Sequence, residues 1–163
     1  MQRTVFNEDH EAFRQTVRDF IAKEVTPVYH EWETEGHPPR KFYNRLGDLG
    51  ILGIQAPEEY GGGGESSLKF NVVVTEETAA AGVTFGSYSV HSYLFLPYIM
   101  QHATEEQKQR WLPGFASGEL MFAIAMTEPG TGSDLANIST TAKLSDDGSH
   151  YVVNGSKTFI TGG

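Results

Sequence analysis

The spacing of apolar residues changes along the chain, from a helical period in the first two thirds to a strand-like period in the last third. Between Phe13 and Val25, apolar side chains recur every three or four residues, and charged side chains occupy the opposite face. This spacing is typical of an amphipathic helix. Asn7 is suited to cap its start, and Pro27 is expected to end or kink it.

A second helix is predicted after the Pro38–Pro39 pair, because Phe42 and Leu46 are spaced to share its inner face and Gly50 follows as a stop. Beyond it, the four consecutive glycines 61–64 break regular structure. They predict either a mobile surface loop or backbone that approaches another segment closely. We prefer the mobile loop, since connections of this composition usually lie at the surface.

Three further helices complete the region before residue 118. Residues 66–82 form the first, capped by a serine and closed by Gly82, and residues 87–102 form the second. The face of the second that is expected to point inward carries Val90, Leu94, Tyr98 and Ile99. Thr104 and Gln107 have capping-box spacing, so a short helix begins there, and Pro113 is expected to stop it.

After Gly118 the pattern becomes strand-like. The run ELMFAIAMT, residues 119–127, is continuously apolar and predicts a buried strand. The segments STTAKLS and HYVVNGSKTFIT alternate and are rich in residues that favour strands. Turn signals at Asp146–Asp147–Gly148 and Asn154–Gly155 predict hairpins.

These patterns predict an α+β chain with two parts. An N-terminal all-α helical bundle covers residues 1–118, and the first strands of a β-barrel-like domain cover residues 119–163. Three or four strands do not close a barrel or form a sandwich. We therefore expect the chain to be truncated within its second domain.

Composition narrows the classes of function. The chain has 163 residues, a net charge of -9 and no cysteine. An acidic surface repels nucleic-acid phosphates, and the lack of cysteine excludes disulfides, thiolate metal sites and a cysteine nucleophile. No cationic segment followed by an apolar run opens the chain, and no apolar run is long enough to cross a membrane. The expectation is a soluble intracellular protein that is not secreted.

Ionisable residues supply little catalytic signal. The six histidines lack metal-binding spacing, and His91, on an otherwise apolar helix, is interpreted as a core histidine. The adjacent carboxylate pairs are interpreted as solvated charges, because neighbouring residues on a helix do not face each other. Glu76 or Glu77 is a candidate exception, since the surrounding sequence is mostly apolar.

The segment AMTEPGTGSD matches no phosphate-loop, nucleophile-elbow or dinucleotide pattern. Pro129–Gly130 favours a tight turn in which Gly130 has a positive φ, and Gly132 permits close approach of a ligand to the backbone. The hydroxyls of Thr127 and Ser133 can donate to a cofactor, and Asp134 can bond backbone N–H groups and hold the loop. The residues alone leave a structural turn and a cofactor site equally open.

Longer segments extend the comparison to a family. FAIAMTEPGTGSD and YVVNGSKTFITGG closely resemble the flavin-contacting segments of the acyl-CoA dehydrogenases. FRQTVRDFIAKEVTPVYHEWE resembles the first helix of that family, LGDLGILGIQAPEEYGGGG its glycine loop, and TEEQKQRWLPGFASGEL its entry into the β domain. The resemblance covers essentially the whole chain, in order.

The resemblance implies a fold and an activity. Members of the family have an N-terminal helical domain, a middle β domain and a C-terminal four-helix domain. With FAD they oxidise an acyl-CoA thioester to the trans-2-enoyl-CoA in fatty acid β-oxidation, and the electrons pass to an electron-transferring flavoprotein. The resemblance also implies a homotetramer, or a dimer, in the bacterial cytoplasm or the mitochondrial matrix.

The resemblance assigns cofactor contacts to two segments. The first comprises Ile124, Ala125, Met126, Thr127, Glu128, Pro129, Gly130, Thr131, Gly132 and Ser133, and the second comprises Phe159, Ile160 and Thr161. Thr127 is expected to bond the flavin ring, and Ser133 to reach the FAD pyrophosphate beside the bound acyl-CoA substrate. Phe159 is expected to flank the flavin, and Thr161 to bond near N5. The helices at 66–82 and 87–102 are expected to wall the acyl-chain pocket.

No catalytic residue is assigned within the chain, because the family's general-base glutamate is expected beyond Gly163. The isolated chain is therefore expected to be inactive. Two alternatives stay open. One is an acyl-CoA oxidase or flavin monooxygenase of the same fold, and the other is a non-catalytic module that binds acyl-CoA or a partner.

Overall fold

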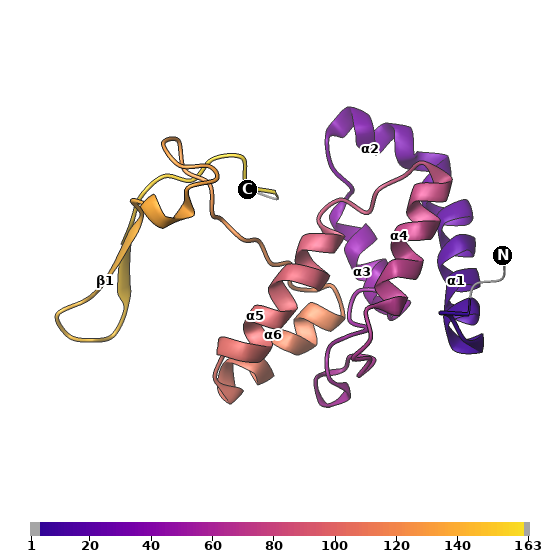
Figure 1. Cartoon of the computed structure of the whole chain (residues 1–163), viewed down its shortest axis with the longest axis horizontal. Coiled ribbons are helices and arrows are strands. Elements are labelled where there is room, and N and C mark those ends of the chain that lie inside the picture. Colours follow the sequence, from indigo (N-terminus) through magenta and orange to yellow (C-terminus); the bar gives the residue numbers. More distant parts are fainter. Residues whose placement is uncertain (1–3, 162–163) are drawn as a thin grey trace. The chain divides into compact units, whose positions relative to one another are not determined.

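The protein is described by a computed structural model that covers residues 4–161. The chain divides into two compact units, Met1–Phe122 and Ala123–Gly163. The boundary predicted from the sequence lay between residues 118 and 119. The first unit is helical and the second carries a short β-hairpin (Figure 1).

Six α-helices form the framework of the first unit. They are α1 (Glu8–Phe20), α2 (Tyr29–Glu35), α3 (Arg40–Asp48), α4 (Lys69–Ala81), α5 (Leu96–His102) and α6 (Glu105–Ala116). Shorter turns connect them: π-helical at Ile21–Val25 and Val90–Phe95, and 3₁₀-helical at Thr26–Val28 and Glu58–Tyr60. Within residues 4–161, no helix is both long enough and apolar enough to cross a bilayer.

Local sequence signals fix most helix ends. The side chain of Asn7 accepts the backbone N–H of His10 at 3.1 Å, and His10 Nδ1 accepts the N–H of Asn7, which confirms the predicted cap of α1. Thr104 and Gln107 form the predicted capping box. Gly82 closes α4 with a φ of +68°.

Pro27 distorts the first helix without ending the helical path. A proline cannot donate a backbone hydrogen bond, and its ring crowds the carbonyl four residues earlier. The chain responds with the π-helical turn at Ile21–Val25 and the 3₁₀ turn at Thr26–Val28, and then continues as α2. The predicted kink is confirmed.

The apolar core of this unit consists of two clusters. The first contains Val17, Phe20, Ile21, Val25, Trp32, Phe42, Tyr43, Leu46, Ile51, Leu52, Val74, Phe85 and Tyr88. The second contains Ala56, Tyr60, Leu96, Ile99, Leu112 and Phe115. Phe42 joins several aromatic rings in the first cluster, with ring centroids 4.9 Å from Trp32 and 5.2 Å from Phe85.

Two helix predictions are wrong. Leu94 and Tyr98, predicted to face inward, are 48% and 57% exposed, while His91 and Ser92 are buried. The π-helical turn at Val90–Phe95 takes more residues per turn than an α-helix, so the phase assumed from the sequence slips.

The second wrong prediction concerns α6, which continues through Pro113 to Ala116. The core favours this extension, because Leu112, Phe115 and Ala116 are all buried. Their burial offsets the backbone hydrogen bond that the proline cannot make.

The glycine loop at 61–64 is held closely against the preceding chain, so the structure agrees with the second of the two interpretations. Gly63 donates its N–H to the carbonyl of Gly53 at 3.0 Å, and Gly64 to that of Ala56 at 2.9 Å. A Cβ on Gly62 would lie 2.1 Å from the carbonyl oxygen of Ala56. Side chains are excluded there by contact between backbones.

Glu77 is the carboxylate that departs from a solvated role. It is buried on α4, where its two oxygens bind Arg14 Nη1 at 3.0 Å and Arg18 Nε at 2.9 Å from α1. The hydrogen bonds from Arg18 and Arg14 hold the pKa of Glu77 below its usual value. These two ion pairs link α1 to α4, and the two helices lie side by side in Figure 1.

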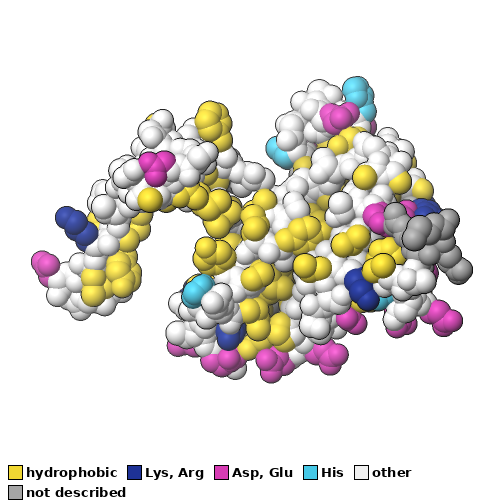
Figure 2. Space-filling model, in the orientation of Figure 1, with side chains coloured by type: hydrophobic (Ala, Val, Ile, Leu, Met, Phe, Trp, Pro, Cys, Tyr) yellow, Lys and Arg dark blue, Asp and Glu magenta, His cyan; other side chains and the backbone are white. Residues whose placement is uncertain are grey.

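The second unit is built on one antiparallel hairpin. β1 (Thr141–Leu144) pairs with β2 (Tyr151–Asn154) so that Thr141 faces Asn154 and Leu144 faces Tyr151. The predicted turn at Asp146–Gly148 is confirmed, with Gly148 at a φ of +71°. Both strands are exposed, and Figure 2 shows apolar side chains gathered over the hairpin.

The remaining strand predictions are wrong. Residues 119–127 form no strand and residues 155–160 form none, so Asn154–Gly155 ends β2 and is not a hairpin turn. A strand needs a neighbour for its backbone N–H and C=O groups. Within residues 4–161, β1 and β2 pair with each other, and no further strand is present to pair with these segments.

Gly82 and Gly118 have similar φ but different surroundings, so substituting each distinguishes backbone strain from a steric clash. Gly82 and Gly118 have φ of +68° and +74°, but a Cβ on Gly82 meets nothing within 4 Å, whereas one on Gly118 would lie 2.2 Å from the carbonyl oxygen of Tyr43. We expect Gly82→Ala to lower the free energy of unfolding by about 1 kcal/mol and Gly118→Ala by about 3 kcal/mol. Urea denaturation measures both, and equal losses would contradict the close contact.

Candidate functional site

The first predicted cofactor segment contains a tight turn. Glu128 donates its N–H to the carbonyl of Thr131 at 2.9 Å, and Thr131 returns a bond at 3.0 Å, with Pro129 and Gly130 between them. The predicted turn is confirmed, but Gly130 does not adopt the expected positive φ. With Pro129 in the first central position, the second accepts an ordinary negative φ.

Glu128 is the centre of the polar contacts around this turn. Its side chain is almost completely buried, and one carboxylate oxygen accepts both the N–H of Ser139 at 2.8 Å and its hydroxyl at 2.6 Å. The other oxygen accepts the N–H of Thr140 at 2.9 Å and Lys157 Nζ at 3.0 Å. These bonds, led by that of the Ser139 hydroxyl, hold the pKa of Glu128 far below its usual value.

Asp134 does not have the role predicted for it. Its carboxylate accepts the side-chain amide of Asn137, and its carbonyl accepts the N–H of the same residue at 3.1 Å. The loop is held by Glu128, which sequence reasoning included only as one member of the cofactor segment. Its partners Ser139 and Lys157 lie 11 and 29 residues away, so local pattern could not indicate them.

The two residues that immediately precede the second predicted segment are bonded to the first segment. Thr158 donates its N–H to the carbonyl of Thr127 at 3.0 Å. Lys157 Nζ donates to the carbonyl of Met126 at 2.9 Å as well as to Glu128. The structure therefore brings together the two segments that the sequence separated by some twenty-five residues.

The surfaces of these two segments differ in exposure. Glu128 and Thr131 are buried within the unit. Ile124, Thr127 and Ile160 are partly buried, and the other predicted contacts, Ala125, Met126, Pro129, Gly130, Gly132, Ser133, Phe159 and Thr161, are exposed. The buried members hold the loop, and the exposed ones are available to a ligand.

The exposed residues fit a flat cofactor that carries a phosphate. Phe159 is 94% exposed and adopts a φ of +54°, an uncommon conformation for an aromatic residue. The space that a Cβ would occupy on Gly130 or Gly132 is open, so a ligand can approach the backbone there. Ser133 and Thr161, which carry hydroxyl groups, are also exposed. An exposed ring, open backbone and hydroxyls are the groups that a flavin nucleotide needs.

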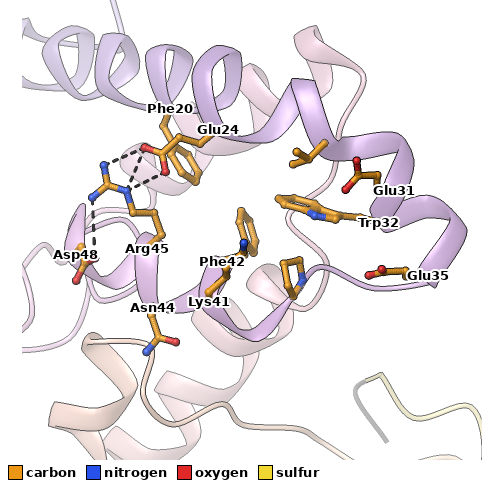
Figure 3. Close-up of a pocket in the computed structure, with 12 residues that line it drawn as sticks. Phe20, Glu24, Glu31, Trp32, Glu35, Lys41, Phe42, Asn44, Arg45 and Asp48 are labelled. Atoms are coloured by element: carbon orange, nitrogen blue, oxygen red, sulfur yellow. Dashed lines mark hydrogen bonds and ion pairs between the residues drawn. The ribbon is translucent and has the colours of Figure 1, made fainter.

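The first unit contains cavities that share no residue with these segments. The larger, about 590 Å³, has a floor of Phe20, Trp32 and Phe42 (Figure 3). Arg45 at its edge binds Glu24 at 2.9 Å. A smaller cavity of about 150 Å³ lies between α4 and the residues that precede α5. It is lined by Val74, Thr75, Thr78, Thr84, Phe85, Gly86, Tyr88, Ser89 and Tyr93.

His91 is a core histidine, as predicted. Its ring is fully buried and stacks on Phe115 with centroids 4.0 Å apart. Nδ1 accepts the N–H of Phe122 at 3.3 Å, and Nε2 lies 3.4 Å from the carbonyl of Phe115. Burial lowers the pKa of His91 to about 4.

This burial predicts a pH dependence of stability. Because the folded pKa of His91 is lowered from 6.5 to about 4, its contribution is complete above pH 6.5 and is lost as the pH falls toward 4. The loss is about 3 kcal/mol, from about 1.4 kcal/mol for each pKa unit. His91→Phe should flatten the unfolding free energy across this range, whereas His102→Phe, at an exposed position, should leave the slope unchanged. A slope that persists in His91→Phe would contradict the assignment.

Comparison with known sequences gives two adjacent family matches. Residues 7–119 match the profile described as "Acyl-CoA dehydrogenase, N-terminal domain". Residues 123–163 match the profile described as "Acyl-CoA dehydrogenase, middle domain". The two matches meet close to the division between the structural units.

Individual proteins agree with these profiles. The chain is 42% identical over 161 residues to the mitochondrial long-chain specific acyl-CoA dehydrogenase of Rattus norvegicus, covering 99% of the chain and 37% of the relative. A crystal structure of an acyl-CoA dehydrogenase from Geobacillus kaustophilus aligns with a TM-score of 0.90 and 45% identity, over 98% of this chain and 41% of that one. An acyl-CoA dehydrogenase complexed with FAD from Bacillus anthracis aligns with a TM-score of 0.78 and 33% identity, over 98% and 28%. The chain thus spans about two fifths or less of the length of these relatives.

Proposed function

Because the chain belongs to the acyl-CoA dehydrogenase family, we propose that the full-length protein binds FAD and converts an acyl-CoA thioester to the trans-2-enoyl-CoA. One observation carries the proposal: the two segments that resemble flavin-contacting segments lie side by side, joined by the Thr158–Thr127 bond. Membership of the family does not by itself establish a working flavin site, and the adjacency of these two segments supports one in this protein.

We propose that four residues of the two segments contact different parts of the cofactor. We assign Thr127 to the flavin ring, Phe159 to its flank and Thr161 to the neighbourhood of N5. Ser133 is assigned to the pyrophosphate and to the bound acyl-CoA. Bound FAD would supply the hydride acceptor, and these residues would bind and orient it.

The first unit is assigned to the acyl chain. We propose that the helical segments 66–82 and 87–102 wall the acyl-chain pocket, and the cavity of about 150 Å³ between α4 and the residues that precede α5 supports this. Its lining combines the aromatic rings of Phe85, Tyr88 and Tyr93 with threonine and serine side chains. Chain length and branching of the substrate are properties that this wall helps to set.

The two buried carboxylates do not suit the role of general base. A base for an α-proton needs a pKa near the working pH, whereas Glu77 and Glu128 both have lowered pKa values. Their oxygens are occupied by arginine in one case and by serine, threonine and lysine in the other. We therefore propose that the base comes from beyond Gly163 and that residues 1–163 alone do not turn over acyl-CoA.

Partners follow from the same proposal. We infer that an electron-transferring flavoprotein accepts the electrons and that the full-length protein is a homotetramer or a dimer. We also infer a location in the bacterial cytoplasm or the mitochondrial matrix. Oxygen consumption by the full-length enzyme would instead favour an acyl-CoA oxidase or monooxygenase, and an absence of bound flavin would favour a non-catalytic binding module.

The activity is tested directly on the full-length protein. We expect it to purify with bound flavin, and anaerobic titration with saturated acyl-CoAs of graded length should bleach the flavin absorption. Enoyl-CoA should form in proportion to the flavin reduced. Flavin that no acyl-CoA of the series reduces would overturn the proposed reaction.

The assignment of Thr127 makes a separate prediction. Thr127→Val keeps the shape of the side chain but removes its hydroxyl, so the affinity of the full-length protein for FAD should fall about 5- to 10-fold, the value of one hydrogen bond. Thr141→Val, an exposed threonine in β1, is the matched control. Fluorescence titration of FAD into flavin-free protein measures both, and equal affinities would remove Thr127 from the flavin contacts.

A further inference from the structure

Three consecutive residues of the first cofactor segment, Met126 to Glu128, are bonded to the two residues that precede the second segment, Lys157 and Thr158. Met126 and Glu128 accept from Lys157 Nζ, at 2.9 Å and 3.0 Å, and the carbonyl of Thr127 accepts the N–H of Thr158 at 3.0 Å. We propose that Glu128 and Lys157 form a positioning pair that fixes the two flavin-facing segments relative to each other before the cofactor binds. The proposal rests on the proposed function.

The ammonium group of Lys157 bonds both neighbours of Thr127, Met126 and Glu128. An ammonium group has three donors, and two of them are used on the carbonyl of Met126 and the carboxylate of Glu128. Thr127 lies between these anchors, and its own carbonyl is bonded to the residue after Lys157. The backbone of Thr127 is therefore restrained at three successive residues.

Glu128 extends the same restraint to the hairpin. It accepts from Ser139 and Thr140, which immediately precede β1, and from Lys157, which lies three residues after the end of β2. A buried carboxylate that has lost its water needs these donors to stay ionised. The turn at 128–131 is thus tied to both ends of the only hairpin in residues 4–161.

These bonds also affect the second cofactor segment, because Phe159 is its first residue. This residue follows Thr158 directly, is 94% exposed and holds a φ of +54°. A positive φ costs free energy in a non-glycine residue and persists only where neighbouring contacts determine it. The bonds of Lys157 and Thr158 are the contacts that precede it, so they support the conformation in which the ring is presented.

The pair therefore acts on flavin binding through preorganisation and not through contact. A site that is ordered in advance loses less conformational entropy when the cofactor binds. Breaking the pair should weaken flavin binding although neither side chain is assigned to the flavin ring. A residue that only stabilised the fold would also loosen the β1–β2 hairpin, so the two roles can be separated.

Three variants of the full-length protein test the pair. Lys157→Met removes the charge but keeps the length of the side chain, and Glu128→Gln keeps its shape but turns an amide N–H₂ toward donors. Lys157→Arg keeps the charge and serves as the conservative variant. Lys143→Met, an exposed lysine in β1, is the matched control for loss of one positive charge.

The first measurement is the affinity of flavin-free protein for FAD. Lys157→Met and Glu128→Gln should each weaken it about tenfold, and the double variant should weaken it by less than the product of the two single effects, because both remove the shared Lys157–Glu128 bond. Lys157→Arg should recover most of the affinity, and Lys143→Met should stay within about twofold of the wild type.

The second measurement is amide hydrogen exchange without flavin. In Lys157→Met, the N–H of Thr158 should exchange faster, while amides paired between β1 and β2 should keep their wild-type rates. An unchanged FAD affinity would overturn the proposal, and so would faster exchange throughout the hairpin, which would indicate a loss of general stability. If the wild-type protein binds no flavin, the proposed function fails, and the exchange rate of Thr158 still decides whether the pair holds the segments together.

Discussion

In the second unit, polar contacts from three separate segments converge on one buried carboxylate, Glu128. Burying the ionised side chain of Glu128 is costly unless donors surround it, so the turn, the start of β1 and the segment after β2 must all converge on it. The geometry of the loop follows from that requirement, since few arrangements of the chain supply so many donors to one carboxylate.

The first unit also buries a carboxylate, but it has a large apolar core. Most of its stability comes from aromatic and aliphatic burial around Phe42 and Leu46, and its buried carboxylate Glu77 is paired with two arginines of α1. Both buried carboxylates are thereby held ionised for structural reasons. The proposed proton transfer requires a carboxylate whose pKa lies nearer the working pH, in an environment that differs from those of Glu77 and Glu128.

Sequence reasoning succeeded where a feature is decided by near neighbours. Asn7, Thr104 and Gly82 mark helix ends through bonds that span a few residues, and the hairpin turn at Asp146–Gly148 is equally local. It failed for Leu94, because a π-helical turn changes the phase of a helix without a clear sign in composition. The apolar run at 119–127 matches the pattern of a buried strand, but a strand also needs partners that a pattern cannot supply.

In the candidate site too, features decided by near neighbours were predicted and those decided by distant residues were not. The turn at Pro129–Gly130 was readable from local chemistry, whereas the role of Glu128 depends on residues 11 and 29 positions away. Phe159 was indicated by resemblance alone, and its positive φ could not be foreseen, because aromatic residues seldom adopt it. That conformation makes sense only with the bonds before it in place, since strain at an exposed ring relaxes unless the adjoining backbone is fixed. We therefore infer that the conformation of the exposed Phe159 depends on the bonds that Lys157 makes to buried Glu128 and that Thr158 makes to Thr127, as the proposed positioning pair requires.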